Sequence, residues 1–350
     1  MKNCEIIEYI RALAKGENLL PPIEMEEILL QHRCDFLLTR LKNPTYKQQK
    51  QQERVFNAIA VKERYKACIP LFSQSDIPYA VIKGATLSKT LYNDPLIRAS
   101  GDIDVLIHRR NADRLKQLLI QNGFVQGRVT KNGIEPFSRR EILFQTAMSH
   151  QTAPYIKATG NKLCPYINLD VNVDILWGES DEKADVDILL SHTEKSEIFN
   201  VSFPKLTPEA EFISLCLHHY KDMNSLYLLS SGSLRLGLFC EICDYLQNVR
   251  PDVLQLCKLC DQLKVGKYVY VCIYQTQEIF DNPTLSLYLK ALKKDMDISL
   301  IHSFGLNEKE RKQWEIALLD RLFHPDLWGY LQGKLTEEEK EKININRELM

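Results

Sequence analysis

The sequence lacks an excess of either charge. Its 45 Lys and Arg residues are balanced by 46 Asp and Glu residues, which leaves a formal net charge of -1. A protein that grips long nucleic acid through its phosphates usually carries a basic surplus. The charge balance therefore argues against nucleic acid as the main partner.

The sequence also lacks any long hydrophobic run. The most apolar short segment, YVYVCIY at Tyr268–Tyr274, is far shorter than the roughly 20 residues that a membrane helix needs. The first twenty residues are charged throughout and contain no apolar stretch of the kind found in a secretory signal. We therefore expect no membrane contact and a cytoplasmic location. In that reducing compartment the ten cysteines are expected to be thiols.

Apolar residues make up 45% of the chain, an ordinary share for a protein with a packed core. Apolar positions three and four residues apart predict an N-terminal helical region over residues 1–75 and a C-terminal one over residues 206–350. Between them, residues 76–205 contain short apolar runs that end at Gly, Pro or Asp, which favours strands mixed with short helices. This organisation predicts an α+β fold, and no internal repeat interrupts it.

Six segments of this central region have the pattern of a strand or a helix. Alternating or short apolar runs indicate the strands, and apolar positions at helical spacing indicate the helices. The expected strands span residues 79–84, 101–107, 138–147 and 167–177, and the expected helices span residues 85–94 and 111–122, the second with Asn111 as its N-cap.

Two aspartates interrupt the apolar strand GDIDVLI. Asp102 and Asp104 lie two residues apart, so their side chains leave the same face of a strand, about 6.6 Å apart along the chain. Two neighbouring carboxylates resist desolvation unless a cation lies between them. Mg2+ meets that need because it prefers carboxylate and phosphate oxygens. A solvated edge strand could carry the same short pattern, so the pair alone does not decide.

A second strand, INLDVNVDILW, offers further carboxylates. Its odd-numbered positions are apolar, while its even-numbered positions include Asp170, Asn172 and Asp174. The two aspartates lie roughly 13 Å apart on an extended strand, so only one of them can share a site with Asp102 and Asp104. Three converging carboxylates can hold two metal ions around a nucleotide's phosphates.

The run from Ile82 to Phe124 resembles the polymerase-beta-like nucleotidyltransferase superfamily. It is most similar to a bacterial branch known only as an uncharacterised nucleotidyltransferase family. The resemblance is good over about residues 76–180 and looser to about 250. The matching elements are Lys83-Gly84, Leu91-Tyr92, Arg98, the strand Gly101–Ile107 and Gly123-Phe124.

This resemblance implies a small mixed-sheet nucleotidyltransferase core between the two helical regions. It also implies a metal-dependent enzyme with Mg2+ or Mn2+ as cofactor. Such an enzyme would move a nucleoside monophosphate, AMP from ATP in the first instance, to a hydroxyl or similar acceptor and release pyrophosphate. The acceptor is open: an antibiotic-like small molecule, a peptide, a polysaccharide precursor, tRNA or a protein side chain.

The resemblance also assigns the catalytic and metal-binding residues. The family's third strand has an acid, an apolar residue, His and Trp, which matches residues 174–177. It thereby favours Asp174 over Asp170 as the partner of Asp102 and Asp104, with Leu176 at the His position. These three aspartates are the expected metal ligands, and Asp174 would also help to deprotonate the acceptor.

Four residues are expected to bind the nucleotide. Lys83 and Gly84 would contact phosphate, although Ala85 follows them where the wider superfamily has Ser or Gly. Arg98 could meet the triphosphate or the acceptor, or cap the preceding turn. Lys221 lies in LCLHHYKD, which resembles a family helix, and a plain helix-end cation is its alternative. The departures at Ala85 and Leu176 favour a second hypothesis, a catalytically weak nucleotide-binding or regulatory protein on the same scaffold.

The pairs CEIC and CKLC have a spacing that is typical of zinc sites. Both pairs fall within amphipathic helical patterns rather than tight turns, which favours small core thiols. A zinc-stabilised helical interaction protein is the third hypothesis, and it would use all four sulfurs: Cys240, Cys243, Cys257 and Cys260.

Overall fold

The computed structural model describes residues 3–15, 17, 23–40, 44–98, 100–178, 180 and 182–349. The described chain forms two compact units. Residues 1–50 and 212–348 contribute to one, called the helical unit here, and residues 51–211 form the other, called the sheet unit. The expected boundaries after residues 75 and 205 differ from this division, because the N-terminal and C-terminal helices belong to one unit and most of α3 (Pro44–Ser73) belongs to the sheet unit.

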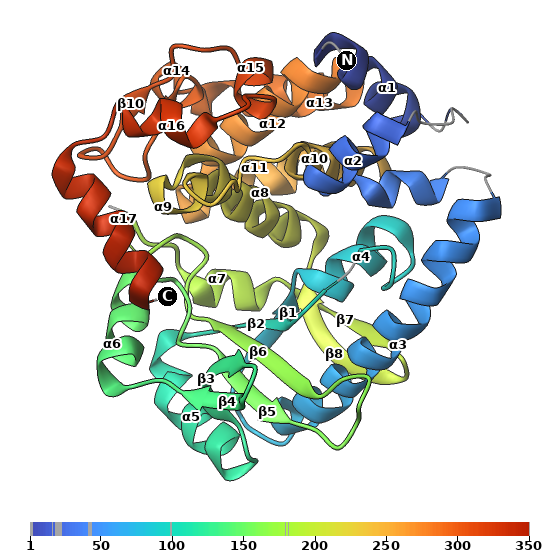
Figure 1. Cartoon of the computed structure of the whole chain (residues 1–350), viewed down its shortest axis with the longest axis vertical. Helices are drawn as coiled ribbons and strands as arrows, with labels where there is room; N and C mark the ends of the chain where they lie inside the picture. The colour runs from blue at the N-terminus through green and yellow to red at the C-terminus, as the bar shows by residue number, and fades with distance from the viewer. Residues whose placement is uncertain are drawn as a thin grey trace. The chain divides into compact units, whose positions relative to one another are not determined.

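The sheet unit contains one eight-stranded mixed sheet, in the order β4-β3-β5-β6-β2-β1-β8-β7 (Figure 1). Its pairs β2–β6 and β1–β8 are parallel, and the remaining neighbours are antiparallel. The prediction of a mixed-sheet core is confirmed, with more strands than the sequence patterns indicated. The strands are β1 (Tyr79–Ile82), β2 (Ile103–Ile107), β3 (Val125–Thr130), β4 (Gly133–Pro136), β5 (Tyr155–Ala158), β6 (Tyr166–Asn172), β7 (Thr193–Ile198) and β8 (Val201–Leu206).

One face of the central strands packs into the core of the sheet unit. Because alternate residues of a strand face opposite sides, the odd-numbered positions of β2 and β6 share this face. They join apolar side chains of α3 and of α5 (Ala112–Gln121) in one cluster. The even-numbered positions, which include the aspartates, leave the other face. Members of the cluster include Tyr65, Ile69, Phe72, Ile103, Val105, Leu115, Leu119, Leu169 and Val171.

The segment 138–147 was predicted to be a strand, and this prediction was wrong: residues Arg139–Met148 form helix α6. The physical reason is a capping box at its start. The Ser138 hydroxyl accepts a hydrogen bond from the Glu141 N–H, and the Glu141 carboxylate accepts one from the Ser138 N–H. The other short helices of this unit are α4 (Gly84–Tyr92) and α7 (Val186–Ser191).

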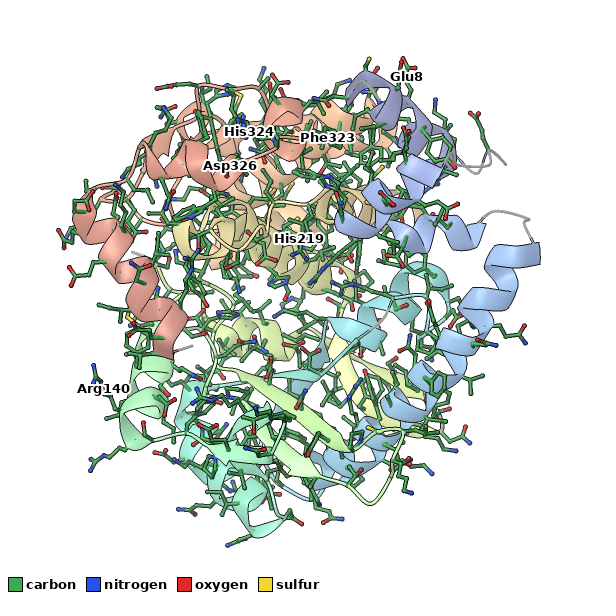
Figure 2. The ribbon with its side chains drawn as sticks, viewed as in Figure 1. Glu8, Arg140, His219, Phe323, His324 and Asp326 are labelled. Carbon is green, nitrogen blue, oxygen red and sulfur yellow. The ribbon has the colours of Figure 1, made fainter. Side chains whose placement is uncertain are left out.

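The chain is again largely helical from Pro208 onward, as predicted. His219 of α8 is fully buried, and its Nε2 lies 3.0 Å from Oε2 of Glu241 on α10 (Figure 2). In the described part of the chain, no helix combines the length and apolar character that crossing a membrane requires. The main elements of the helical unit are α1 (Asn3–Ala14), α2 (Ile23–Gln31), α8 (Pro208–Asn224), α10 (Leu236–Asn248), α11 (Val253–Leu263), α12 (Gly266–Phe280), α13 (Pro283–Ala291), α15 (Leu318–Leu322), α16 (Leu327–Gln332) and α17 (Glu337–Leu349).

Candidate active site

The first residues of β2 lie beside the end of β1. The two strands are antiparallel, and Ile82, the last residue of β1, pairs with Asp104. Lys83 follows directly and precedes α4, so the strand-to-helix turn brings a lysine next to the aspartates of β2. This arrangement unites two sequence-predicted elements, the Lys83-Gly84 turn and the Asp102–Asp104 pair.

Asp104 is a buried carboxylate with two polar neighbours. Its side chain is 8% exposed, and its Oδ1 lies 3.5 Å from Nζ of Lys83. The same oxygen accepts a hydrogen bond of 3.1 Å from Nδ2 of Asn172. A buried charge is tolerated when it is paired and hydrogen-bonded, and both conditions are met here.

Asn172 ties this group together, and sequence reasoning gave it no role. It is 1% exposed. Its Nδ2 also donates to the backbone oxygen of Val105, at 3.3 Å. Its Oδ1 accepts from Nε2 of Gln151 at 3.1 Å and from Nζ of Lys83 at 3.5 Å. The only sequence signal was its even position on the aspartate face of β6.

Asp102 lies at the entrance of β2 and is held by its own loop. The Ser100 hydroxyl donates to the backbone oxygen of Asp102 at 2.8 Å and lies 3.3 Å from its Oδ1. Arg64 of α3 donates to the Ser100 backbone oxygen. Burial raises the pKa of Asp102, and the negative charge of Asp104 raises it further, against the opposing effects of Lys83 and Arg64. The two carboxylates would therefore be stabilised by additional positive charge.

The sequence resemblance favours Asp174 as the third carboxylate, and the register of the neighbouring strands makes Asp170 a second candidate. In the parallel pair β2–β6, Asp104 is the direct partner of Asp170. Paired residues on neighbouring strands leave the same face, with the strands about 4.8 Å apart. Asp174 lies four residues further on, after β6 has ended at Asn172.

Asp174 has a local structural role. Its Oδ1 accepts hydrogen bonds from the N–H groups of Ile175 and Leu176, at 2.7 and 3.1 Å. Burial raises the pKa of its carboxyl, while these bonds and the charges of Arg109 and Lys183 lower it.

The turn between β1 and α4 has an unusual backbone. Lys83 has a φ of 56° and a ψ of -158°, a region that is almost exclusive to glycine. Gly84 follows with a φ of 48°, and a Cβ atom at Gly84 would lie 2.8 Å from Oγ of Ser100. Glycine is therefore required at position 84 both by backbone conformation and by close approach. Strain of this kind tends to be retained at functional sites.

The two other predicted nucleotide-binding residues are Arg98 and Lys221. Arg98 follows α4, where its backbone N–H donates to the Ser88 hydroxyl at 3.1 Å. Lys221 belongs to the helical unit and lies in the last turn of α8. The neighbouring Asp222 has Oδ2 3.7 Å from Nε2 of His218. The roles of Arg98 and Lys221 toward a nucleotide stay predictions.

Two of the four cysteines of the zinc hypothesis have side-chain contacts, and these are to different residues. Sγ of Cys240 lies 3.8 Å from Sγ of Cys34, and Sγ of Cys243 lies 3.8 Å from Nδ2 of Asn282. Burial raises the pKa of the Cys257 and Cys260 thiols, which favours their protonated form. Across the described ranges, no three His, Cys, Asp or Glu side chains are arranged to hold a metal ion as they stand. Within the described residues, neither the four cysteines nor the aspartates form such a group.

The oxygen donors on the aspartate face nevertheless suit a hard cation. Asp102, Asp104 and the paired Asp170 supply carboxylate oxygens, the ligand type that Mg2+ prefers. One lysine accompanies the two aspartates of β2, and its ammonium group already contacts Asp104. The donor chemistry therefore fits a divalent ion, provided that the side chains rearrange around it.

Comparison with known proteins shows that this chain is similar to a protein family and to a solved structure. Residues 42–281 match a protein family described as uncharacterised nucleotidyltransferase. The crystal structure of an antigenic nucleotidyltransferase-like protein from Paracoccidioides brasiliensis is 17% identical, and the alignment covers 69% of this chain and 94% of that chain with a TM-score of 0.37. A search of curated proteins found no match.

Proposed function

Because this chain belongs to the uncharacterised nucleotidyltransferase family, we propose that it transfers a nucleoside monophosphate from a nucleoside triphosphate to an acceptor hydroxyl or similar group. ATP is the proposed donor and pyrophosphate the released product. The observation that carries the proposal is Asp104, which leaves one face of β2 beside Lys83 and opposite Asp170, with Asp102 directly before the strand.

The proposed metal ligands are Asp102 and Asp104, with Asp170 in place of Asp174. A bound Mg2+ or Mn2+ ion would draw the triphosphate toward these carboxylates and offset its negative charge. The raised pKa of Asp102 supports this role, since its charged form gains from a nearby cation.

The chain's own residues would position the reactants. In the reaction, the acceptor oxygen forms a bond to the α-phosphorus, and the bond from that phosphorus to the bridging oxygen breaks as pyrophosphate leaves. Asp170 would take the proton from the acceptor hydroxyl, a task suited to a carboxylate beside a cation. Lys83 and the start of α4 at Gly84 would contact the phosphates. Arg98 is proposed as a further phosphate contact.

The direct test uses each α-labelled nucleoside triphosphate, Mg2+ or Mn2+, and a lysate of the organism that encodes the chain. We expect label on one class of acceptor and pyrophosphate in solution. Asp102→Asn and Asp104→Asn should abolish both signals without loss of the folded state. Asp76→Asn is the control, because this aspartate belongs to the same unit and its side chain is 96% exposed. Full labelling by either β2 variant would refute the proposed site.

A nucleotide-binding regulatory protein is the second candidate. Leu176 at the family's His position and the Lys83–Asp104 contact favour it, since a lysine that permanently occupied the cation position would prevent metal binding. Nucleotide binding without label transfer, over a broad set of acceptors, would support this alternative.

A further inference from the structure

The position of the Lys83 ammonium group differs from the one expected of a phosphate-binding lysine. Its Nζ lies 3.5 Å from both Oδ1 of Asp104 and Oδ1 of Asn172, and the Lys83 side chain is only 14% exposed. The ammonium group thus occupies space next to the carboxylate that a divalent ion would need. It contributes one positive charge where the negative charge of Asp104 also acts on Asp102.

The surroundings of Asn172 fix this arrangement. Gln151 and the backbone oxygen of Val105 hold the Asn172 amide, so that its Oδ1 faces Lys83 and its Nδ2 faces Asp104. Because the amide is nearly fully buried and bonded on both ends, it has little freedom to turn. Asn172 is therefore a positioning residue for the ion pair.

The main chain at Lys83 is fixed as well, but its side chain can move. The β1–α4 turn has its unusual φ and ψ values at Lys83, and Gly84 packs against Ser100. Lysine, however, carries its charge on a flexible four-carbon stem. The ammonium group can therefore swing several ångströms by side-chain rotation, without any change in the strands.

We propose that Lys83 is a resident counter-ion of Asp104 that a divalent cation must displace, and that the displaced ammonium group then contacts the nucleotide's phosphates. This inference rests on the proposed function, and it adds a mechanism by which metal and nucleotide binding are coupled. In the empty site, Lys83 neutralises Asp104 and competes with the metal. In the loaded site, the metal neutralises the carboxylates and Lys83 is released to the triphosphate.

The test is Mn2+ binding to the protein without nucleotide, measured at pH 8 by the paramagnetic resonance of free Mn2+. Lys83→Met removes the competing charge, and we expect its Kd for Mn2+ to fall by about tenfold or more. Lys83→Gln is a second neutral variant in case the first does not fold. Lys89→Met is the matched control, because Lys89 lies on α4, the helix that begins at Gly84 directly after Lys83, and donates to the Glu197 backbone oxygen. It should bind Mn2+ like the wild type.

The affinity for nucleotide should change in the opposite direction to the affinity for Mn2+. Binding of an ATP analogue with a methylene group between the α- and β-phosphorus atoms should weaken in Lys83→Met, because one phosphate contact is lost. If Lys83 had a purely structural role, its replacement would not strengthen the binding of one ligand and weaken the binding of the other. If both neutral Lys83 variants bind Mn2+ as tightly as the wild type or more weakly, the proposed competition between Lys83 and the metal ion is refuted.

The outcome separates this inference from the proposed function. If wild type and Lys83→Met bind Mn2+ equally, and Lys83→Met with Asp104→Asn does not bind it, the metal site stands and only the displacement is refuted. If Mn2+ binds to none of the variants, the metal site itself is refuted and the inference falls with it.

Discussion

Asp170 of β6 pairs directly with Asp104 of β2, in a parallel register that leaves Asp174 beyond the end of the strand. The identity of the third carboxylate depends on this relationship, and it can be tested by mutation at two positions four residues apart.

Asp170→Asn should lower the turnover rate by about 10^2- to 10^4-fold, the usual effect of losing a general base. Asp174→Asn should stay within a few fold of the wild type, because the amide oxygen of Asn can still accept from Ile175 and Leu176. Steady-state pyrophosphate release measures both variants. A large loss in Asp174→Asn with full activity in Asp170→Asn would restore the assignment made from the family resemblance.

Gly84→Ala should destabilise the protein by about 1–3 kcal/mol, because the new Cβ atom meets Oγ of Ser100 and the φ of 48° disfavours alanine. The displaced Ser100 hydroxyl would also lose its bond to Asp102. Gly101→Ala is the control, since a Cβ atom there has no atom within 4 Å. Urea unfolding measures both changes. Equal stability of the two variants would show that the turn tolerates a side chain.

His32 should make the stability of the helical unit depend on pH. Burial and, after it, the charge of Arg235 lower its pKa from 6.5 to about 4. The Leu236 N–H donates to its neutral Nδ1 at 3.2 Å. Between these two values, the unfolded chain binds a proton that the folded chain does not. The contribution of neutral His32 to the free energy of unfolding is therefore complete above pH 6.5. It is lost as the pH falls toward 4, by up to about 1.4 kcal/mol per pH unit.

Urea unfolding of the wild type and of His32→Asn at several pH values between 7 and 4 measures this effect. The asparagine keeps a hydrogen-bond acceptor near Leu236 but does not titrate. Its stability should fall less steeply over the same interval. Parallel curves for the two proteins would show that His32 does not contribute.

Treatment with a zinc chelator should leave the thermal stability of the helical unit unchanged. Cys240 and Cys243 contact Cys34 and Asn282 respectively, and the burial-raised pKa values of Cys257 and Cys260 disfavour the thiolates that zinc requires. We therefore expect the melting temperature to be the same with and without a zinc chelator. Elemental analysis should find well under one zinc per chain. Stoichiometric zinc together with a melting temperature that the chelator lowers would support the zinc hypothesis.

Local patterns were sufficient where the decisive interactions are local. The alternation of GDIDVLI predicted the strand that residues 103–107 form, and residues 85–92 of the predicted helix lie in α4. The segment 138–147 shows the limit of apolar patterning. Its Ser138–Glu141 capping box is also a local signal, and it favours the helix that the apolar pattern did not predict.

The sequence by itself determined that aspartates interrupt the apolar strand of residues 103–107 and alternate with apolar residues in β6, because side-chain alternation along one strand is a property of that strand alone. Only the tertiary structure decided that Asp170 lies opposite Asp104 and that Lys83 and Asn172 share the same carboxylate. These are relations between strands, set by how β1, β2 and β6 slide against one another as their apolar faces pack. A shift of four residues would exchange Asp170 for Asp174 without altering the pattern of either strand.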